Sequence, residues 1–368
     1  MHRSSLYLLL VLAGSTSAAL SACGGSGTLA PPKSDNQEDD PCDPGSGSTQ
    51  AGPTAAVDAG ALPVPLPGGE GGIGFDDLRF SSTLSTLLIP AGRTGNLDLV
   101  DPSSEAVSSV GGFSTAPTYT DDSFGVTSAD EGNAIVYAAD RTSNTLAVIN
   151  PKQQAIVSHV ALAATPGYVR YVAPTNEVWV TEPTEHQIEV FTLGSTPTAA
   201  PVHSMVIAVS NGPESLEIDP VGKRAYTNAT TATVAIDVVG HAVVSTWPNG
   251  CETSRGIAVD PTNGWVIAAC QEGMVVVLAT QGGATIGTAP VGAGVDQIAY
   301  DAQRVRLYVP SPTAAAMSVV SLGTSGSPKV LGSIQTTNDA HCAVTPGGGE
   351  VFVCAPSRGV LLFNNDPF

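Results

Sequence analysis

The feature that most constrains the fold is a seven-fold repeat of short apolar strands. From about Asp77 onward, helical periodicity is absent, and short alternating apolar runs are separated by Gly, Pro, Asn and Asp. One strand of each unit carries a large central residue, and these residues recur at intervals of about 41 to 49 positions: Leu88, Tyr137, Trp179, Tyr226, Ile267, Tyr308 and Phe352. Such a period indicates units that pack on their neighbours, so we expect the large residues to lie between units and not in a ligand site.

Each unit supplies the same four parts in the same order. A first strand ends in a turn such as Asp219-Pro220, and the strand with the large residue follows. A third strand such as "NTLAVIN" (144–150) and a fourth such as "AIVSHV" (155–160) complete the unit. Four short antiparallel strands form one propeller blade. The sequence therefore predicts an all-β fold, a seven-bladed β-propeller of four-stranded antiparallel blades.

Three stretches carry a family resemblance. These are "Tyr226-Thr227-Asn228", "Leu307-Tyr308-Val309", and "VYAAD" (136–140) followed by "NTLAVIN" (144–150). They resemble the YVTN-type repeats of YncE-like, seven-bladed bacterial β-propellers, over roughly residues 77 to 365. The resemblance implies architecture and leaves activity open, and Leu88 and Ile267 depart from its aromatic pattern.

The last unit ends before a fourth strand can form. It stops at "GVLLF" (359–363), and a missing strand would leave an exposed sheet edge. We expect residues within 57–76, including "ALPVPLP" (61–67), to fill that place and close the ring, because prolines suit only an edge strand.

The amino terminus has the order of a secretion signal. His2 and Arg3 precede an apolar run that is too short to span a membrane, and small residues follow. "LSAC" (20–23) resembles the bacterial lipobox, in which the cysteine becomes the first mature residue and carries acyl chains. We therefore expect a lipoprotein signal peptide at 1–22 and lipidation of Cys23; the alternative is an ordinary signal with an incidental cysteine.

An acylated Cys23 would place the protein in the bacterial cell envelope, anchored to a membrane through its lipid. By resemblance to enterobacterial sorting, Gly24 favours the outer membrane, on its periplasmic side or at the cell surface. Residues 23–72 are rich in Gly, Ser, Pro and acidic side chains, which predicts a flexible tether ahead of a propeller at 73–368. Within the tether, residues 69–74 match Gly-x-Gly-x-x-Gly, but no strand precedes them and no helix follows, so we expect no phosphate site.

The remaining cysteines lie in an oxidising exterior, where thiols tend to pair. Cys342 and Cys354 flank a hairpin with its turn at 346–349, which predicts one disulfide. Cys251 precedes one strand and Cys270 ends the next, which predicts a second. Cys42 is then free or paired between molecules. The alternative is that these are ordinary buried thiols.

The formal net charge of −19 argues against nucleic acid as a partner and against a basic patch for anionic lipid. We expect a monomer whose partners are the membrane, through the lipid, and an envelope protein, peptide or glycan.

Loops at one mouth of the central channel hold the candidate binding residues, since the folded part contains no catalytic sequence motif. The loops that lead into the first strands offer Tyr168, Glu214, Arg255, Asp296, Asp339 and His341. The segments that follow the large residues offer Arg141, Glu182, Asn228 and Gln271, together with Arg93, Glu185, His186, Glu272 and Arg358.

Two interpretations give the mouth a specific chemistry. Glu214, Asn228 and Asp296 could supply oxygen ligands to Ca²⁺ or another divalent metal, which would resemble the site of gluconolactonase-type propellers. His341 beside Asp339 suggests a general base, although no nucleophile accompanies it. Solvated polar loop residues are the simpler interpretation of both groups, and no cofactor is expected.

Two functional hypotheses follow. The first is an envelope-anchored binding or scaffold module that acts through its channel-mouth loops, supported by the tether, the regular repeats and the missing catalytic signatures. The alternative is an enzyme that resembles lactonase or streptogramin-lyase propellers and uses the same mouth.

Overall fold

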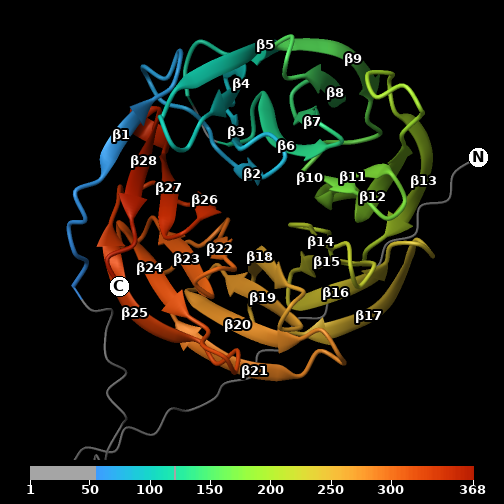
Figure 1. The fold of residues 1–368 in the computed structure, drawn as a ribbon. Coiled ribbons are helices and arrows are strands. Elements are labelled where there is room, and N and C mark those ends of the chain that lie inside the picture. The colour runs from blue at the N-terminus through green and yellow to red at the C-terminus, as the bar shows by residue number, and fades with distance from the viewer. Residues whose placement is uncertain (1–54, 120–121) are drawn as a thin grey trace, which may run out of the picture. The chain divides into compact units, whose positions relative to one another are not determined.

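The computed structural model describes residues 55–119 and 122–368. Seven sheets of four antiparallel strands each are arranged around a central channel (Figure 1). The predicted all-β, seven-bladed propeller is therefore confirmed. The expected signal peptide, Cys23, Cys42 and the tether up to residue 54 lie outside the described residues.

The first three blades run in chain order from the channel outward. Blade 1 consists of β2 (Arg79–Ser81), β3 (Thr86–Pro90), β4 (Thr94–Val100) and β5 (Val107–Thr115). Blade 2 consists of β6 (Val126–Gly132), β7 (Ile135–Asp140), β8 (Thr145–Asn150) and β9 (Ala155–Ala161). Blade 3 consists of β10 (Val169–Val172), β11 (Glu177–Glu182), β12 (Gln187–Thr192) and β13 (Val202–Ala208).

The next three blades repeat this order. Blade 4 consists of β14 (Glu217–Asp219), β15 (Arg224–Ala229), β16 (Ala232–Asp237) and β17 (Ala242–Pro248). Blade 5 consists of β18 (Ser254–Asp260), β19 (Trp265–Cys270), β20 (Met274–Ala279) and β21 (Thr285–Pro290). Blade 6 consists of β22 (Ala299–Asp301), β23 (Arg306–Ser311), β24 (Ala316–Ser321) and β25 (Lys329–Gln335).

Blade 7 joins the two ends of the described chain. It consists of β26 (Ala343–Gly347), β27 (Glu350–Ala355), β28 (Val360–Asn365) and β1 (Leu62–Pro65). Two short 3-10 turns, η1 (Pro183–Glu185) and η2 (Pro356–Arg358), follow second strands. No helix in residues 55–119 and 122–368 is long and apolar enough to cross a membrane.

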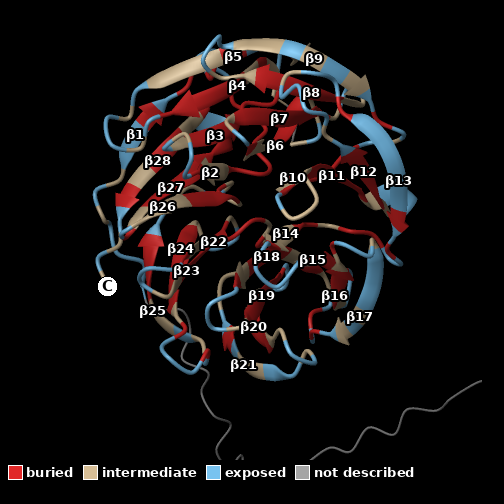
Figure 2. Ribbon diagram, turned by 45° about the vertical axis from the view of Figure 1, so that its right-hand side comes forward, coloured by how far each residue is buried: buried red, intermediate tan, exposed pale blue. Residues whose placement is uncertain are grey.

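Burial differs between the strands of a blade, as Figure 2 shows. The second strand β7 is buried along its whole length, whereas the outermost strand β13 is exposed at six of its seven positions. The difference arises because blades stack face to face around the ring, so an inner strand is covered on both faces. The second strands are therefore mainly apolar in the sequence, whereas the outer strands mix apolar and polar residues.

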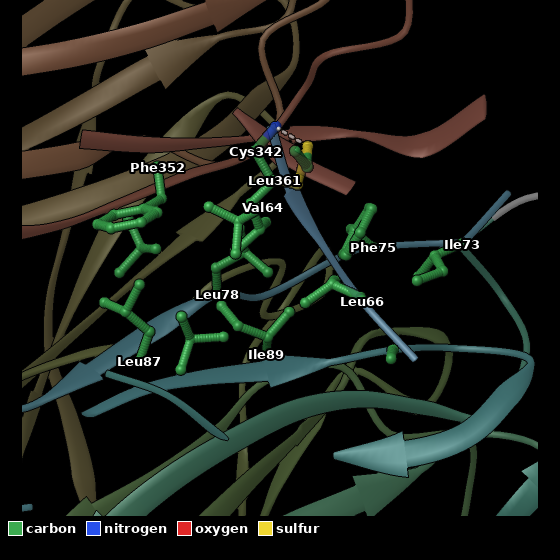
Figure 3. Close-up of a cluster of buried hydrophobic side chains, with 14 residues drawn as sticks. Val64, Leu66, Ile73, Phe75, Leu78, Leu87, Ile89, Cys342, Phe352 and Leu361 are labelled. Carbon is green, nitrogen blue, oxygen red and sulfur yellow. Dashed lines mark hydrogen bonds between the residues drawn. A yellow bond between two sulfur atoms is a disulfide. The ribbon is translucent and has the colours of Figure 1, made fainter. Parts of the chain in front are cut away.

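The large central residues lie between blades, as predicted. All seven are buried, and each belongs to a cluster that includes the following blade. Phe352 of blade 7, for example, packs with Leu87 and Ile89 of blade 1 (Figure 3). These contacts join the last blade to the first, so the core runs round the whole ring.

The ring is closed by the amino-terminal strand β1, which pairs antiparallel with β28. Val64 lies opposite Leu361 and is only 1% exposed. Further upstream, Val57 exchanges backbone hydrogen bonds of 2.8 and 2.9 Å with Ser333 and Gln335 of β25. The expected closure is confirmed. The boundary expected at residue 73 is too late, because 57–65 already belong to the rims of blades 6 and 7.

The Gly-x-Gly-x-x-Gly run crosses closely over blade 7 on its way to β2. A β-carbon at Gly69 would collide with the carbonyl oxygen of Gly359. Arg93 Nε donates to the Gly72 carbonyl at 2.9 Å, and the Ile73 amide donates to the Pro356 carbonyl at 2.8 Å. Close backbone crossing therefore accounts for Gly69 and Gly72 of this run.

Both predicted disulfides are present. Cys251 and Cys270 have a Cα–Cα distance of 5.2 Å, and Cys342 and Cys354 have one of 5.5 Å. Each bond ties the loop that leads into a first strand to the neighbouring second strand. Blade 5 and blade 7 therefore each contain one internal disulfide, and both bonds lie at the end of the channel where the candidate binding loops are.

Candidate functional site

A polar cavity of about 630 Å³ occupies one end of the channel, and we call it the mouth cavity. Its wall is built from loops that precede first strands and loops that follow second strands. Tyr168 directly precedes β10, and Asp296 lies three residues before β22, so both are carried by short segments fixed at the inner sheet edge. Arg141 directly follows β7.

Eight of the ten channel-mouth residues predicted from the sequence line this cavity: Tyr168, Glu214, Arg255, Asp296, Asp339, His341, Arg141 and Gln271. They come from six different blades, so the ring geometry brings them together across the channel. Their position is thereby established, while their role in binding stays a prediction.

Glu182 and Asn228 do not line the cavity, and for these two the predicted position was wrong. Glu182 is buried and accepts hydrogen bonds from the Ala164 amide at 2.8 Å and from Gln187 Nε2 at 2.6 Å. Asn228 is also buried, and its amide donates to the Gly256 carbonyl at 2.9 Å. Both side chains satisfy local backbone groups, which explains why they turn away from the channel.

Five polar residues of the mouth cavity were not predicted from the sequence: Asp76, Tyr119, Asp122, Thr165 and Thr184. Asp76 lies in the loop that leads into the first strand of blade 1, the same relative position as Asp296 in blade 6. This equivalent position in the repeat would have allowed Asp76 to be predicted from the sequence. Tyr119 and Asp122 lie in the connection from β5 to β6, which leads into the first strand of blade 2 and is a longer counterpart of the loop from β9 to β10 that carries Tyr168.

Two arginines are committed to carboxylates in the wall. Arg141 Nη2 lies 2.5 Å from Asp76 Oδ2, and Arg255 Nη1 lies 2.8 Å from Glu214 Oε2. Arg141 also donates from Nε to the Pro166 carbonyl at 2.9 Å. These contacts fix both guanidinium groups against the wall and leave neither as an isolated positive charge.

His341 is held as a double donor. Its Nδ1 lies 2.8 Å from the Asp339 carbonyl oxygen, and its Nε2 lies 2.9 Å from the Phe75 carbonyl oxygen. A carbonyl oxygen only accepts, so both contacts are hydrogen bonds when the ring carries both protons. Burial lowers the pKa of His341, but the Asp296 carboxylate and the two carbonyls outweigh this and raise it above its ordinary value.

The carboxylates of Asp76 and Asp296 both lie in the wall of the mouth cavity, and burial raises the pKa of both. Burial raises the pKa of Asp76 to about 7, against the lowering effect of Arg141 and with the help of Asp296 and Asp122. Burial likewise raises the pKa of Asp296, although nearby His341 opposes the shift. Burial and the proximity of the other carboxylates therefore disfavour the ionised forms of both groups.

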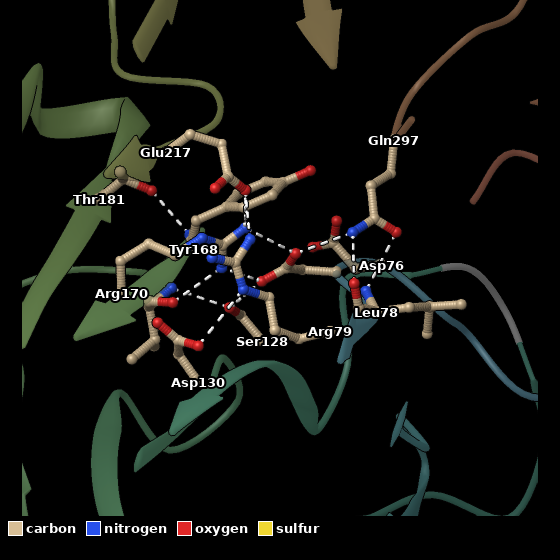
Figure 4. A network of polar contacts seen from close by, with 12 residues as sticks. Asp76, Leu78, Arg79, Ser128, Asp130, Tyr168, Arg170, Thr181, Glu217 and Gln297 are labelled. Atoms are coloured by element: carbon tan, nitrogen blue, oxygen red, sulfur yellow. Dashed lines mark hydrogen bonds and ion pairs between the residues drawn. The ribbon is translucent and has the colours of Figure 1, made fainter. Parts of the chain in front are cut away.

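Below the mouth cavity, a buried network of ion pairs crosses the channel (Figure 4). Arg170 pairs with Asp77 and Glu217, and Gln297 Nε2 donates to Asp77 Oδ1 at 2.9 Å. The guanidinium of Arg170 also lies 5.0 Å from the ring centre of Tyr168. A second cavity of about 270 Å³ lies beyond this network, and Tyr168 lines both cavities.

The geometry does not favour a divalent-metal site from the predicted set. Asn228 Oδ1 accepts from Thr233 Oγ1 at 2.9 Å, and Glu214 is paired with Arg255, so only Asp296 of that trio is uncommitted. Asp122, Asp296 and His341 have ligand atoms within 4.8 Å of one another, but both His341 nitrogens face carbonyl oxygens. The same contacts make His341 a poor proton acceptor, which weakens the general-base interpretation.

Comparison with known proteins identifies the fold and nothing finer. No family model matches the sequence, and no curated protein does. Among solved structures, a chain of the hydrazine synthase of Kuenenia stuttgartiensis is similar, with a TM-score of 0.65 and 14% identity over 81% of this chain and 96% of that chain. A chain in a crystal structure of the mitotic checkpoint complex has the same TM-score, 0.65, and identity, 14%, over 92% of this chain and 98% of that chain. At such identity the likeness extends to a seven-bladed β-propeller alone.

Proposed function

We propose that the protein is a bacterial envelope lipoprotein whose propeller binds an envelope protein, peptide or glycan through the mouth cavity. The lipid on Cys23 would hold it at a membrane, most simply the outer membrane, and the segment after it would act as a tether. The fold itself supports a binding or scaffold module in general terms, because propellers present loops from every blade around one channel.

One observation carries the proposal: the mouth cavity is polar, and residues from six blades and from the segment that enters blade 1 converge on it. Arg141, Arg255 and His341 are each fixed by hydrogen bonds to wall groups. The disulfide Cys342–Cys354 immobilises the loop that carries His341. A site fixed in this way loses little conformational entropy on binding, which favours recognition of a defined partner.

Site-specific photocrosslinking in intact cells tests the binding role. A photoreactive side chain placed at Gln271, in the mouth cavity, should capture a defined partner. The same side chain at Asp101, in the exposed turn between β4 and β5, is the matched control. Equal capture from both positions, or none from Gln271 across growth conditions, would contradict the proposal.

Replacement of Cys23 by Ala tests the anchor separately, because only the cysteine offers the thiol that takes the diacylglycerol. We expect the variant to lose its lipid mass and its processing before residue 23. It should also leave the detergent phase in a phase-separation assay. A variant that kept the same lipid mass would show that Cys23 is not the lipidation site.

A further inference from the structure

The mouth cavity carries more negative than positive charge. Its wall holds two arginines and His341 against five carboxylates: Asp76, Asp122, Glu214, Asp296 and Asp339. Asp76 and Glu214 have arginine partners, and Asp339 Oδ2 accepts from the Ser357 amide at 2.6 Å. Asp122 and Asp296 form no ion pair within 4.0 Å among the described residues, although a nitrogen of His341 lies within 4.8 Å of an oxygen of each and Arg141 Nη1 donates to the Asp122 carbonyl at 3.1 Å.

A second and independent feature is the hydroxyl of Tyr168. The residue is 7% exposed and lines the cavity, yet in residues 55–119 and 122–368 its hydroxyl has no hydrogen-bond partner. Burial raises the pKa of Tyr168, and the Asp76 and Asp296 carboxylates raise it further. Tyr168 lines the cavity, and a hydroxyl without a protein partner there is free to hydrogen-bond a ligand.

The spacing of the two uncommitted carboxylates suits one nitrogen. Their nearest oxygens lie within 4.8 Å of each other. An ammonium nitrogen that makes two N–H···O bonds of about 2.8 Å at a tetrahedral angle bridges oxygens roughly 4.6 Å apart. The third proton of the ammonium can then be accepted by a hydroxyl oxygen.

A hard metal ion fits this set less well. Calcium takes six to eight oxygen ligands, whereas the described wall offers Asp122 and Asp296 as its two uncommitted carboxylates. His341 cannot supply a ligand nitrogen while both of its nitrogens donate to carbonyls. An organic cation, which needs few ligands and can extend its chain into the remaining volume, is the better match.

We propose that the mouth cavity binds a primary alkylammonium group between Asp122 and Asp296, with the Tyr168 hydroxyl as a third contact. The inference rests on the proposed binding function and names the chemistry of its ligand. Such a group occurs at the end of a lysine side chain in a peptide and in a free diamine. The cavity is large enough to hold the attached chain.

Calorimetric titration of the full-length protein, kept in detergent at low salt, tests this. The probes are cadaverine, N-acetyl-lysine-N-methylamide and, as an uncharged control, 1-pentanol. We expect both amines to bind and pentanol not to bind. Asp296→Asn should weaken amine binding by roughly tenfold or more and Tyr168→Phe by roughly threefold, since each removes one hydrogen bond and Asp296→Asn also removes a charge. Asp101→Asn, an exposed carboxylate at the other end of the strands, should leave it unchanged.

The outcomes separate the ligand sources and the two proposals. Tighter binding of the lysine derivative points to a peptide, and tighter binding of cadaverine to a free diamine. Amine binding that survives both Asp296→Asn and Asp122→Asn would overturn the site. Calcium that binds alone and displaces the amine would replace the ammonium by a metal. If no amine binds while Gln271 still captures a partner, the ammonium inference fails and the binding function stands; if neither occurs, both fail.

Discussion

Arg170 and Asp77 face each other in a two-point ion pair, although 93 positions separate them in the chain. Nη1 lies 2.5 Å from Oδ2 and Nη2 lies 3.0 Å from Oδ1, with the two side chains 2% and 0% exposed. Arg170 also contacts Glu217, so the pair links blade 3 to blade 4 and to the segment that enters blade 1. Ion pairs thus join the inner strands at the centre of the ring, whereas apolar contacts join the faces of neighbouring blades.

Removal of one partner should therefore be far more damaging than removal of a surface pair. We expect Arg170→Ala to lower the free energy of unfolding by about 3 to 5 kcal/mol, because it leaves Asp77 buried without its cation. Arg224→Ala, which breaks the exposed pair with Asp237, is the matched control and should cost less than about 1 kcal/mol. Urea unfolding followed by tryptophan fluorescence measures both; equal losses would mean that the central pair is not structurally important.

Ring closure by β1 predicts that substitutions at two positions of this strand, Val64 and Leu62, differ strongly in their effect on the free energy of unfolding. Val64 is 1% exposed and packs in the core between blades 7 and 1, whereas Leu62 is 54% exposed. Val64→Asp should lower the free energy of unfolding by more than about 3 kcal/mol, because it buries a charge without a partner. Leu62→Asp should change it by less than about 0.5 kcal/mol. Similar stability of the two variants in thermal unfolding would show that β1 is not part of the folded ring in solution.

The disulfides should stabilise the mouth of the channel. Chain-entropy estimates for loops of 12 and 19 residues are both about 3 kcal/mol, so replacement of either pair by alanine should cost about that much. Loss of Cys342–Cys354 should in addition make β1 and blade 7 the first sites of limited proteolysis, because opening begins where the ring closes. Non-reducing peptide mapping should recover both bonds, and a bond from Cys42 to any of these four cysteines would contradict the assignment.

The blades and their closure could be predicted from sequence because they depend on periodicity. Tyr137 and its equivalents recur once per blade, which marks the strand of each blade that is covered on both faces. The last unit lacks a fourth strand, so another segment, such as 61–67, must supply it. The disulfides followed in the same way, since their partners flank adjacent strands. The repeat period and the order of strands along the chain were therefore sufficient to predict the blades, the ring closure and the disulfides.

The mouth cavity was predictable only in part, because sequence position places a residue near the channel without giving the direction of its side chain. Glu182 ends β11 and Asn228 lies near the end of β15, where hydrogen bonds to the Ala164 amide and the Gly256 carbonyl hold these side chains away from the channel. Asp122 lies in the loop that leads into blade 2, which is longer than the loop from β9 to β10, so the repeat does not give its position relative to the channel. The pairing of Asp77 with Arg170 depends on which blades meet across the channel, and no local pattern encodes that relationship.

Asp98 in β4 supplies a prediction about pH. Burial raises the pKa of this carboxyl to about 6 from an ordinary value of 3.8, and the hydrogen bond from Ser109 lowers it only partly. No cation neutralises it among the described residues, and its Oδ2 has no hydrogen-bond partner there. Between about pH 4 and 6 the folded state therefore holds a proton that the unfolded chain has lost, so stability falls as the pH rises through this window and then levels off.

Asp98→Asn removes the charge while keeping the shape of the protonated acid, so it should abolish that decline. We expect the variant to match the unsubstituted protein near pH 4 and to exceed its free energy of unfolding by about 2 to 3 kcal/mol at pH 7.5. Asp101→Asn, at an exposed carboxyl whose pKa is lowered by hydrogen bonds from Ser103, should produce no gain at pH 7.5. Urea unfolding at the two pH values decides the matter. If Asp98→Asn is less stable than the unsubstituted protein at both, the buried carboxyl is held ionised by a partner, and its burial does not destabilise the fold at neutral pH.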